Sequence, residues 1–257
     1  MELASHCLGG DLAVLQAYCT QANVTAEQVR EVQALQIACA RGYLEVARWL
    51  QQTFQLTALD ARIKGNYALR KACEFGHLAV THWLQQTFQL NAEDARTDDN
   101  YALRWACLFG HLETARWLQQ TFQLTAADAR ANDNYVLQWT CANGYLEVAC
   151  WLQRTFQLTA LDARANDNYA LRGACAYGHL EVARWLQQTF QLTAADARAA
   201  NNFALHWACV HCHFEIARWL LQTFQLTAAD ARSKNNRIVR IACERGLLEV
   251  VHWLQRT

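Results

Sequence analysis

Proline is absent from this chain of 257 residues, and no linker-like stretch interrupts it. The sequence therefore offers no internal boundary, and we expect one domain over residues 1–257. Long apolar runs are also absent, since none approaches the roughly 18 residues of a membrane-crossing helix. The N-terminus, MELASHCLGGDLAVLQ, lacks the basic segment of a secretory signal. Neither a membrane partner nor secretion is predicted.

Net charge is zero, because 23 Lys and Arg residues balance 23 Asp and Glu residues. A nucleic-acid-binding protein usually carries a basic face, so this balance disfavours nucleic acid as a partner. The chain has no glycine-rich loop that could cradle a nucleotide, no G-x-S-x-G motif, and no carboxylate pair outside its repeating pattern. We therefore expect no enzyme activity, no catalytic residues and no cofactor.

What the chain has in abundance is repetition. The string NYALRWACLFGHLETARWLQQTFQLTAADARAND at residues 100–133 recurs in step every 34 residues. A period of this size indicates a solenoid, in which each unit buries its apolar face only against its neighbours. A degenerate N-terminal capping repeat, six full repeats and a C-terminal half repeat cover residues 1–31, 32–65, 66–99, 100–133, 134–167, 168–201, 202–235 and 236–257.

The third copy illustrates the first two helices of each repeat. Asn100 is expected to be the N-cap of a first helix over residues 101–108, which Gly110 ends. A second helix is predicted over residues 112–122. Its apolar side chains cover a wide arc, as suits a helix held between two neighbouring layers.

A third, shorter helix is predicted at the end of each repeat. Thr125 and Asp128 form a variant of the capping box, which opens this helix, and we expect it to end near residues 130–132. The predicted fold class is all-α, an α-solenoid with about three helices per layer.

Residues 169–182, YALRGACAYGHLEV, resemble the T-P-L-H-x-A-A-x-x-G-H-L-E-I/V signature of the ankyrin-repeat family, and residues 68–84 and 102–118 carry the same pattern. Tyr-Ala or Phe-Ala replaces the family's Thr-Pro, and FQLTAADAR replaces its glycine-rich finger. The chain thus resembles a divergent, proline-free type with 34-residue repeats, in which a short helix replaces the β-hairpin finger. The resemblance implies stacked helix-turn-helix repeats whose first helices line a concave groove. It also implies that the two residues before each Gly-His pair contact partners.

Eleven cysteines are present, and seven of them recur at one position of the repeat. Neighbours in this column lie one layer apart, about 10 Å, which exceeds the Cα separation of roughly 7 Å that a disulfide tolerates. They are interpreted as small buried residues in a reducing compartment. The chain is therefore expected to be intracellular, in the cytoplasm.

Three positions of the first helix vary freely between the near-identical copies. The sixth position holds Ile, Lys, Trp and Gly, and the ninth and tenth vary as widely. A close-packed core does not tolerate such changes in volume, so we expect these positions to face away from it, on the concave face. The candidate partner-binding residues are Lys71, Glu74, Phe75, Trp105, Leu108, Phe109, Trp139, Asn143, Tyr177, Trp207 and His211.

The aromatic members of this set suggest a binding surface, flanked by Arg70, Arg104 and Arg172. Trp, Tyr and Arg are the residues that most often anchor interfaces, and an exposed apolar patch usually marks a contact. The alternative interpretation is that the rings lie flat, pack on one another between layers and only stiffen the groove.

Two polar columns have structural interpretations. The Asp and Arg of each D-A-R triplet recur in every layer, which indicates helix capping and pairing between layers rather than an anion site. The histidine of the Gly-His pair is replaced by Tyr43, Tyr145 and Leu247 in three units. This tolerance excludes a catalytic base repeated in each layer and fits a hydrogen bond that stabilises the turn.

Residues 209–213, CVHCH, gather four side chains that could bind a soft metal. On a helix end these side chains point apart, so no metal site is expected. Cys212 stands where the other full repeats have glycine. We expect it in a left-handed conformation that costs about 1 kcal/mol relative to glycine.

These observations favour a non-enzymatic scaffold that binds a protein or peptide partner through its concave face. One alternative is a self-assembling structural array, because the C-terminal unit, with IVRI at 238–241 and two valines at 250–251, is more apolar than the interior copies. Another is a sequence-reading nucleic-acid-binding protein, since the 34-residue helical repeats superficially resemble transcription-activator-like effectors. The chain's end within a repeat also fits a fragment, whereas its unpaired cysteines and ten tryptophans disfavour a designed sequence.

Overall fold

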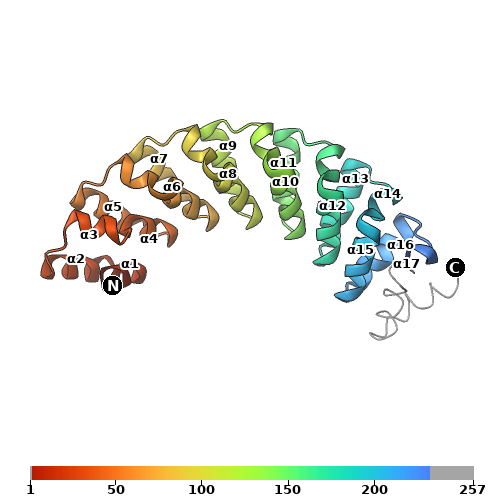
Figure 1. Cartoon of the computed structure of the whole chain (residues 1–257), viewed down its shortest axis with the longest axis horizontal. Coiled ribbons are helices and arrows are strands. Elements are labelled where there is room, and N and C mark those ends of the chain that lie inside the picture. Colours follow the sequence, from red (N-terminus) through yellow and green to blue (C-terminus); the bar gives the residue numbers. More distant parts are fainter. Residues whose placement is uncertain (1, 232–257) are drawn as a thin grey trace. The chain divides into compact units, whose positions relative to one another are not determined.

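The computed structural model describes residues 2–231, and every regular element within them is a helix (Figure 1). The chain divides into two compact units, Met1–Asp128 and Ala129–Thr257, each of which stacks its own layers of helices. The C-terminal half repeat, with the apolar residues that suggested self-assembly, lies outside the described residues.

The first unit holds the N-terminal layers. Its helices are α1 (Glu2–Gly9), α2 (Leu12–Gln21), α3 (Ala26–Glu31), α4 (Ala34–Ala40), α5 (Leu44–Phe54), α6 (Ala58–Glu74), α7 (Leu78–Phe88), α8 (Ala92–Leu108), α9 (Leu112–Phe122) and the start of α10 (Ala126–Ala142). The second unit continues with α11 (Leu146–Phe156), α12 (Ala160–Ala176), α13 (Leu180–Phe190), α14 (Ala194–Ala197), α15 (Ala199–Val210), α16 (Phe214–Thr223) and α17 (Ala228–Ala231).

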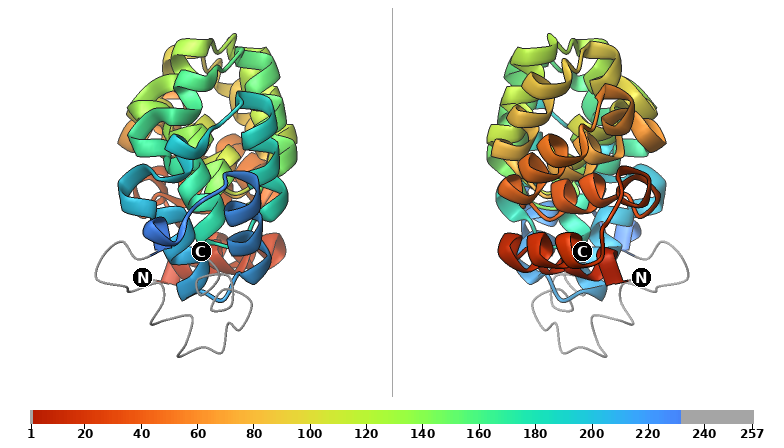
Figure 2. Two further views of the ribbon diagram at one scale, coloured as in Figure 1. Left: turned by 90° about the vertical axis from the view of Figure 1, so that its right-hand side faces the viewer. Right: turned by 90° about the vertical axis from the view of Figure 1, so that its left-hand side faces the viewer.

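Equivalent helices of successive layers pack side by side. In the first unit α4, α6 and α8 form one row, and α5, α7 and α9 form the other. Figure 2 (right) views these layers from the N-terminal side, where the red and orange helices lie one above another. In the second unit α12 packs on α15, and α11 packs on α13. The predicted all-α solenoid of stacked helix pairs is therefore confirmed.

Each layer is filled by the same few side chains. Leu69 and Leu103 of the first helices, and Leu84 and Leu118 of the second helices, are completely buried in the first unit. The recurring cysteines lie beside them, are fully buried and form no disulfide: Cys39, Cys73, Cys107, Cys141, Cys175 and Cys209. Burial raises the pKa of these thiols, so they remain neutral and behave as small apolar residues, as predicted.

The Asp and Arg columns join one layer to the next. The Asp128 carboxylate accepts hydrogen bonds from the Thr125 backbone N–H at 2.7 Å and from Arg96 Nε at 2.8 Å. Burial alone would raise the pKa of Asp128, but the bonds from Arg96 and Thr125 outweigh it and the pKa falls below its usual value. The same arrangement recurs at Asp60, Asp94, Asp162, Asp196 and Asp230. The predicted capping and pairing between layers are confirmed.

The third helix of each repeat is present, and an unexpected turn follows it. In α8, helical geometry stops at Thr97, and Asp98, Asp99 and Asn100 are all left-handed, with φ of 57°, 52° and 60°. Equivalent turns occupy Lys64-Gly65-Asn66, Asn132-Asp133-Asn134, Asn166-Asp167-Asn168 and Ala200-Asn201-Asn202. Glycine, asparagine and aspartate tolerate this conformation best, which explains the composition of the turn.

This turn overturns the prediction that Asn100 is an N-cap. An N-cap residue needs an extended backbone and a side-chain oxygen that accepts from the first turn, whereas Asn100 is left-handed and its Oδ1 is buried without a partner. The equivalent Asn66 instead bonds to the end of its own repeat, since its Nδ2 donates to Thr97 Oγ1 at 2.9 Å. The boundaries of the predicted first and second helices hold, because α8 ends at Leu108 and α9 spans residues 112–122.

The Gly-His pairs also connect neighbouring layers. Gly76 has a φ of +70°, and a Cβ there would lie 2.5 Å from Nδ1 of His111 in the following layer. The imidazole of His111 hydrogen bonds to the backbone of Glu74, beside that glycine. Glycine is therefore favoured at position 76 by the left-handed turn and by the space that the next histidine occupies. The hydrogen bond predicted for this column exists, and it runs between layers.

Candidate protein-binding surface

The tenth position of the repeat projects aromatic rings from the ends of the first helices. Phe75, Phe109 and Tyr177 are the C-cap residues of α6, α8 and α12, and their exposed fractions are 51%, 40% and 52%. Such exposure of large aromatic side chains has a cost in water that a partner could relieve. We name the sixth and tenth positions of the second to sixth full repeats the first-helix face: Lys71, Phe75, Trp105 and Phe109 in the first unit, and Trp139, Asn143, Gly173, Tyr177, Trp207 and His211 in the second.

The ninth position is not part of this face. Glu74 and Leu108 have exposed fractions of only 7% and 8%, so the expectation that this position faces away from the core is wrong. The reason is packing between layers, because the sixth position of one layer lies against the ninth position of the preceding layer. At Gly173, a sixth position, an added Cβ would lie 2.7 Å from the Cβ of Ala142, a ninth position. The two positions can therefore vary together where neither could vary alone.

Glu74 is buried with its charge satisfied. Its Oε2 accepts from Lys71 Nζ at 2.6 Å and from the Tyr101 hydroxyl, also at 2.6 Å. Burial lowers the pKa of Lys71, but the bonds to Glu74 and Tyr101 more than restore it, and the pKa is raised overall. Lys71 also lies 5.9 Å from the centre of the Phe75 ring. This network holds Lys71 against the aromatic rings beside it and reduces its freedom to meet a partner.

Most aromatic rings on the first helices contact one another along the helix. In α8 the ring centres of Tyr101 and Trp105 are 5.2 Å apart, and those of Trp105 and Phe109 are 5.5 Å apart. These are contacts at i, i+4 spacing, as neighbouring turns of a helix allow. The rings thus pack on one another, and the ring at the helix end keeps an exposed edge. Both interpretations of the aromatic residues therefore describe part of the surface.

In the second unit rings pack on one another along α10 and α15, and also between α10 and α12. Trp139 packs on Tyr169 of the next layer with ring centres 5.3 Å apart, and Trp207 packs on Phe203 at 5.7 Å. Asn143 is half-buried, whereas His211 is exposed and its Nδ1 lies 2.7 Å from the Ala176 carbonyl oxygen. Trp139 and Trp207 are thus held by neighbouring rings, and Asn143 and His211 follow the last residues of α10 and α15.

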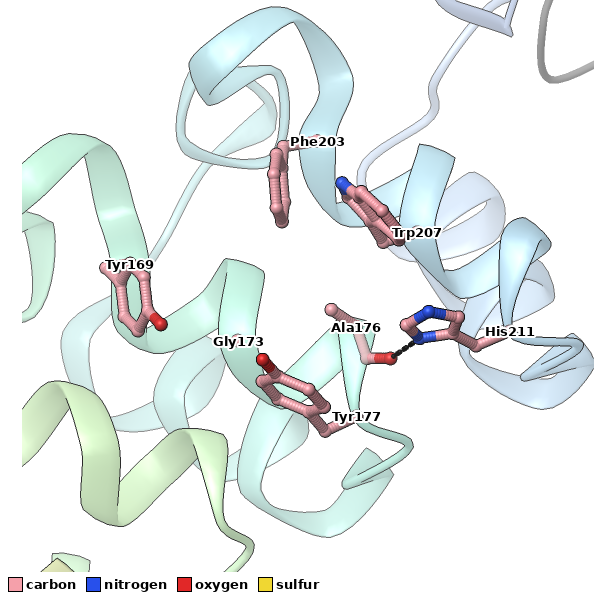
Figure 3. A pocket seen from close by; sticks show the side chains of 7 residues that line it. All are labelled: Tyr169, Gly173, Ala176, Tyr177, Phe203, Trp207 and His211. Atoms are coloured by element: carbon pink, nitrogen blue, oxygen red, sulfur yellow. Dashed lines mark hydrogen bonds between the residues drawn. The ribbon is translucent and has the colours of Figure 1, made fainter.

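A hollow of about 130 Å³ opens on this face of the second unit. It lies beside Gly173, the one described sixth position without a side chain, and its wall consists of Tyr169, Gly173, Ala176, Tyr177, Phe203, Trp207 and His211 (Figure 3). In Figure 3 the rings of Tyr169, Phe203, Trp207 and Tyr177 surround the open space. A glycine inside a helix, at a position where other repeats have tryptophan, was the signal for this hollow, but the rings that face it from the next layer could not be inferred.

Arg172 lies close to two of these rings. Its guanidinium carbon is 4.8 Å from the centre of the Phe203 ring and 5.6 Å from that of Tyr169. Its Nη2 donates to the Asn166 carbonyl at 2.9 Å, whereas its buried Nε has no partner. Burial lowers the pKa of Arg172, and the charge of Asp167 only partly opposes this effect. The equivalent Arg70 differs, because it forms an ion pair with Asp98.

No metal site accompanies these features in the described part of the chain, where no three His, Cys, Asp or Glu side chains cluster in a way that could hold an ion. Cys212 has a φ of 62°, which confirms the predicted left-handed conformation. Among the described helices, none combines the length and the apolar character needed to cross a membrane.

Comparison with known proteins agrees with this architecture. A family model described as ankyrin repeats in three copies matches residues 137–235 and 171–256. A second model, described as ankyrin repeats in many copies, matches residues 69–119. No curated protein matches the chain. Together with the stacked helix pairs and the Gly-His turns, these matches show that the chain belongs to the ankyrin-repeat family.

Proposed function

We propose that this protein is a non-enzymatic scaffold that binds a protein or peptide partner through its first-helix face. Ankyrin repeats are generally protein–protein interaction modules. The observation that carries the proposal is the exposure of the rings at the tenth position, Phe75 and Phe109 in the first unit and Tyr177 in the second. Aromatic side chains on a preformed rigid surface are favourable anchors, because they bury much apolar area at little cost in conformational entropy.

The packing among the aromatic residues supports the proposal. Trp105 is held between Tyr101 and Phe109, and Trp207 is held between Phe203 and His211. Rings that are fixed before binding lose little freedom when a partner arrives, so the contacts that stiffen the helix also prepare the surface. The two interpretations of these side chains, packing and binding, are therefore compatible.

We further propose that the repeats over residues 1–257 act as one array in a reducing, intracellular compartment. Ten described cysteines form no disulfide, and the recurring column is fully buried. Thiols in this state suit a cytoplasmic protein. Nothing among the described residues favours nucleic acid over a protein partner, since the arginines of the layers are largely engaged with aspartates.

The test compares the wild-type chain with the triple variant Phe75→Ala/Phe109→Ala/Tyr177→Ala. Each chain is immobilised, and proteins captured from the source cell's lysate are identified by mass spectrometry. The matched control is Leu59→Ala/Leu161→Ala, which removes exposed apolar side chains from the third helices, outside the first-helix face. We expect the wild type and the control to retain a protein that the triple variant loses, with equal helical circular dichroism in all three. Equal capture by all three would contradict the proposal.

A further inference from the structure

The hollow at Gly173 exists because one side chain is missing from a regular row. The other described full repeats have Lys71, Trp105, Trp139 or Trp207 at this position, or Ile37 in the first. In α12 the glycine leaves space between the rings of two layers, and α12 packs directly on α15. A glycine within a helix costs about 1 kcal/mol relative to alanine. Here a Cβ would also collide with Ala142, so the close packing on Ala142 favours glycine at this position. The open space beside Gly173 is therefore part of how this layer packs.

The size and lining of the hollow favour an apolar guest. Its volume of about 130 Å³ is close to that of engineered protein cavities of about 150 Å³ that hold benzene. Four aromatic rings form most of the wall, and the imidazole of His211 is engaged with the Ala176 carbonyl at 2.7 Å (Figure 3). A leucine, methionine or phenylalanine side chain suits such a wall, since each can fill it without leaving a polar atom unpaired.

Arg172 determines the charge of the guest. This guanidinium is half-buried, forms no ion pair among the described residues, and lies beside two rings that line the hollow, with its carbon 4.8 Å from the centre of Phe203 and 5.6 Å from that of Tyr169. A cationic guest would be repelled at this distance, whereas a carboxylate would restore the stabilisation that burial has removed. The planar guanidinium of an arginine also recognises a carboxylate better than a lysine does.

We propose that the hollow at Gly173 docks a large apolar side chain of an acidic peptide segment, and that an Asp or Glu beside that residue pairs with Arg172. This inference rests on the proposed function, because it names the partner chemistry for one part of the first-helix face. Neighbouring residues of an extended peptide are spaced about 3.4 Å apart, so one segment reaches both the hollow and the guanidinium.

The experiment selects peptides from a random 12-residue display library on the full-length protein. Enriched peptides are then synthesised with a fluorescent label, and their affinities are measured by anisotropy. We expect the enriched sequences to place Leu, Met or Phe within two residues of Asp or Glu. Replacing the acidic residue of the peptide by Lys, or the apolar residue by Ala, should weaken binding by about tenfold or more.

Two variants of the protein test the site from opposite directions. Arg172→Gln removes the charge, and the matched control Arg70→Gln removes the equivalent arginine that Asp98 already neutralises. Ala176→Leu fills the hollow, and leucine is the natural residue at this position in another layer, as Leu108. We expect Arg172→Gln and Ala176→Leu each to weaken the enriched peptide by about tenfold, and Arg70→Gln to change it less than about twofold.

Charge reversal gives the most specific readout. The Arg172→Glu variant should recover affinity for the peptide whose acidic residue is Lys, which a purely structural role of Arg172 would not produce. Failure to enrich any peptide, enrichment without the acidic and apolar pair, or affinities unaffected by Arg172→Gln would overturn the docking site. If Phe75, Phe109 and Tyr177 are still required for partner capture in that case, the proposed function stands and only the assignment of the hollow fails.

Discussion

Arg62 of one layer donates two hydrogen bonds to the Asp94 carboxylate of the next, from Nε at 2.8 Å and from Nη2 at 2.9 Å. The same carboxylate accepts from the Asn91 backbone N–H at 2.9 Å. One side chain therefore caps its own helix and binds the preceding layer. Because Asp94 is buried, this joint is better shielded from water than an ordinary surface ion pair.

Removing this carboxylate should destabilise the protein strongly. Asp94→Ala breaks the cap and leaves the Arg62 guanidinium without its partner, so we expect a loss of about 3 kcal/mol in the free energy of unfolding. The measurement is urea denaturation followed by circular dichroism. Arg48→Ala is the control, since Arg48 pairs with Glu45 at 3.5 Å on the surface, and this change should cost less than about 0.5 kcal/mol. Equal losses in the two variants would contradict the role of the joint.

The histidines between layers should make stability depend on pH. Burial lowers the pKa of His77, His111, His179 and His213 in the folded chain. The unfolded chain then binds more protons, so this stability is fully present above about pH 6.5 and is lost as the pH falls toward the lowered values. Denaturation midpoints between about pH 8 and pH 5 should show the decline.

Replacing one of these histidines by tyrosine, which occurs at the same position in other repeats, tests its share of the pH dependence. Tyrosine takes this place as Tyr43, whose ring lies where a Cβ on Gly10 would be. His111→Tyr should therefore fold, and its stability should fall less on acidification than that of the wild type, because one titrating group is gone. The wild-type chain, denatured in parallel at each pH, is the reference. An unchanged slope in His111→Tyr would show that the histidine column does not set it.

The left-handed turns predict a stabilising substitution. Ala200 has a φ of 49° in a position where Asp98, Asn132 and Asn166 occur in other layers. Ala200→Asn should raise the free energy of unfolding by about 0.5–1 kcal/mol, because asparagine tolerates the left-handed region better than alanine. The reverse change, Asn166→Ala, should lower stability by a similar amount. Thermal unfolding by circular dichroism measures both, and a destabilising effect of Ala200→Asn would contradict this account.

The turn at Cys212 predicts a second stabilising change. Its φ of 62° suits glycine, which stands at the equivalent Gly144 and Gly178. Cys212→Gly should therefore stabilise the protein by about 1 kcal/mol. Cys150→Ala, a change of a partly exposed cysteine within α11, controls for loss of a thiol and should have a smaller effect. A loss of stability in Cys212→Gly would mean that the thiol makes a contribution that its backbone geometry does not explain.

The sequence predicted the features that one repeat determines by itself. The bounds of the second helix, the short third helix, the cap at Asp128 and the left-handed Cys212 follow from local spacing and residue type. The features that were missed depend on two layers at once. The burial of Glu74 arises from the next layer's Tyr101, and the hollow at Gly173 is formed by rings on α15. A pattern read within one repeat contains no information about such distances.

The Asn100 prediction failed for a different reason. Asparagine is favoured both as an N-cap and in the left-handed region, so residue type alone does not decide between them. The run of three Asx or Gly residues was the distinguishing signal, because a single N-cap needs only one. The exposed rings, and an arginine without an ion pair among the described residues, indicate the chemical class of the partner. They do not identify a particular molecule.

The joint between Arg62 and Asp94 has a consequence for how this gene can change in length. From Arg62 to Arg198, each arginine of the column in the described part of the chain meets an aspartate that was supplied by a different copy of the same 34-residue unit. Deleting or inserting one whole unit by recombination would bring together an arginine and an aspartate in the same geometry, and the repaired joint would be chemically indistinguishable from the original. A change of any other length would misalign every contact after it. The protein can therefore gain or lose repeats one whole unit at a time, while the exposed residues of each layer are free to diverge.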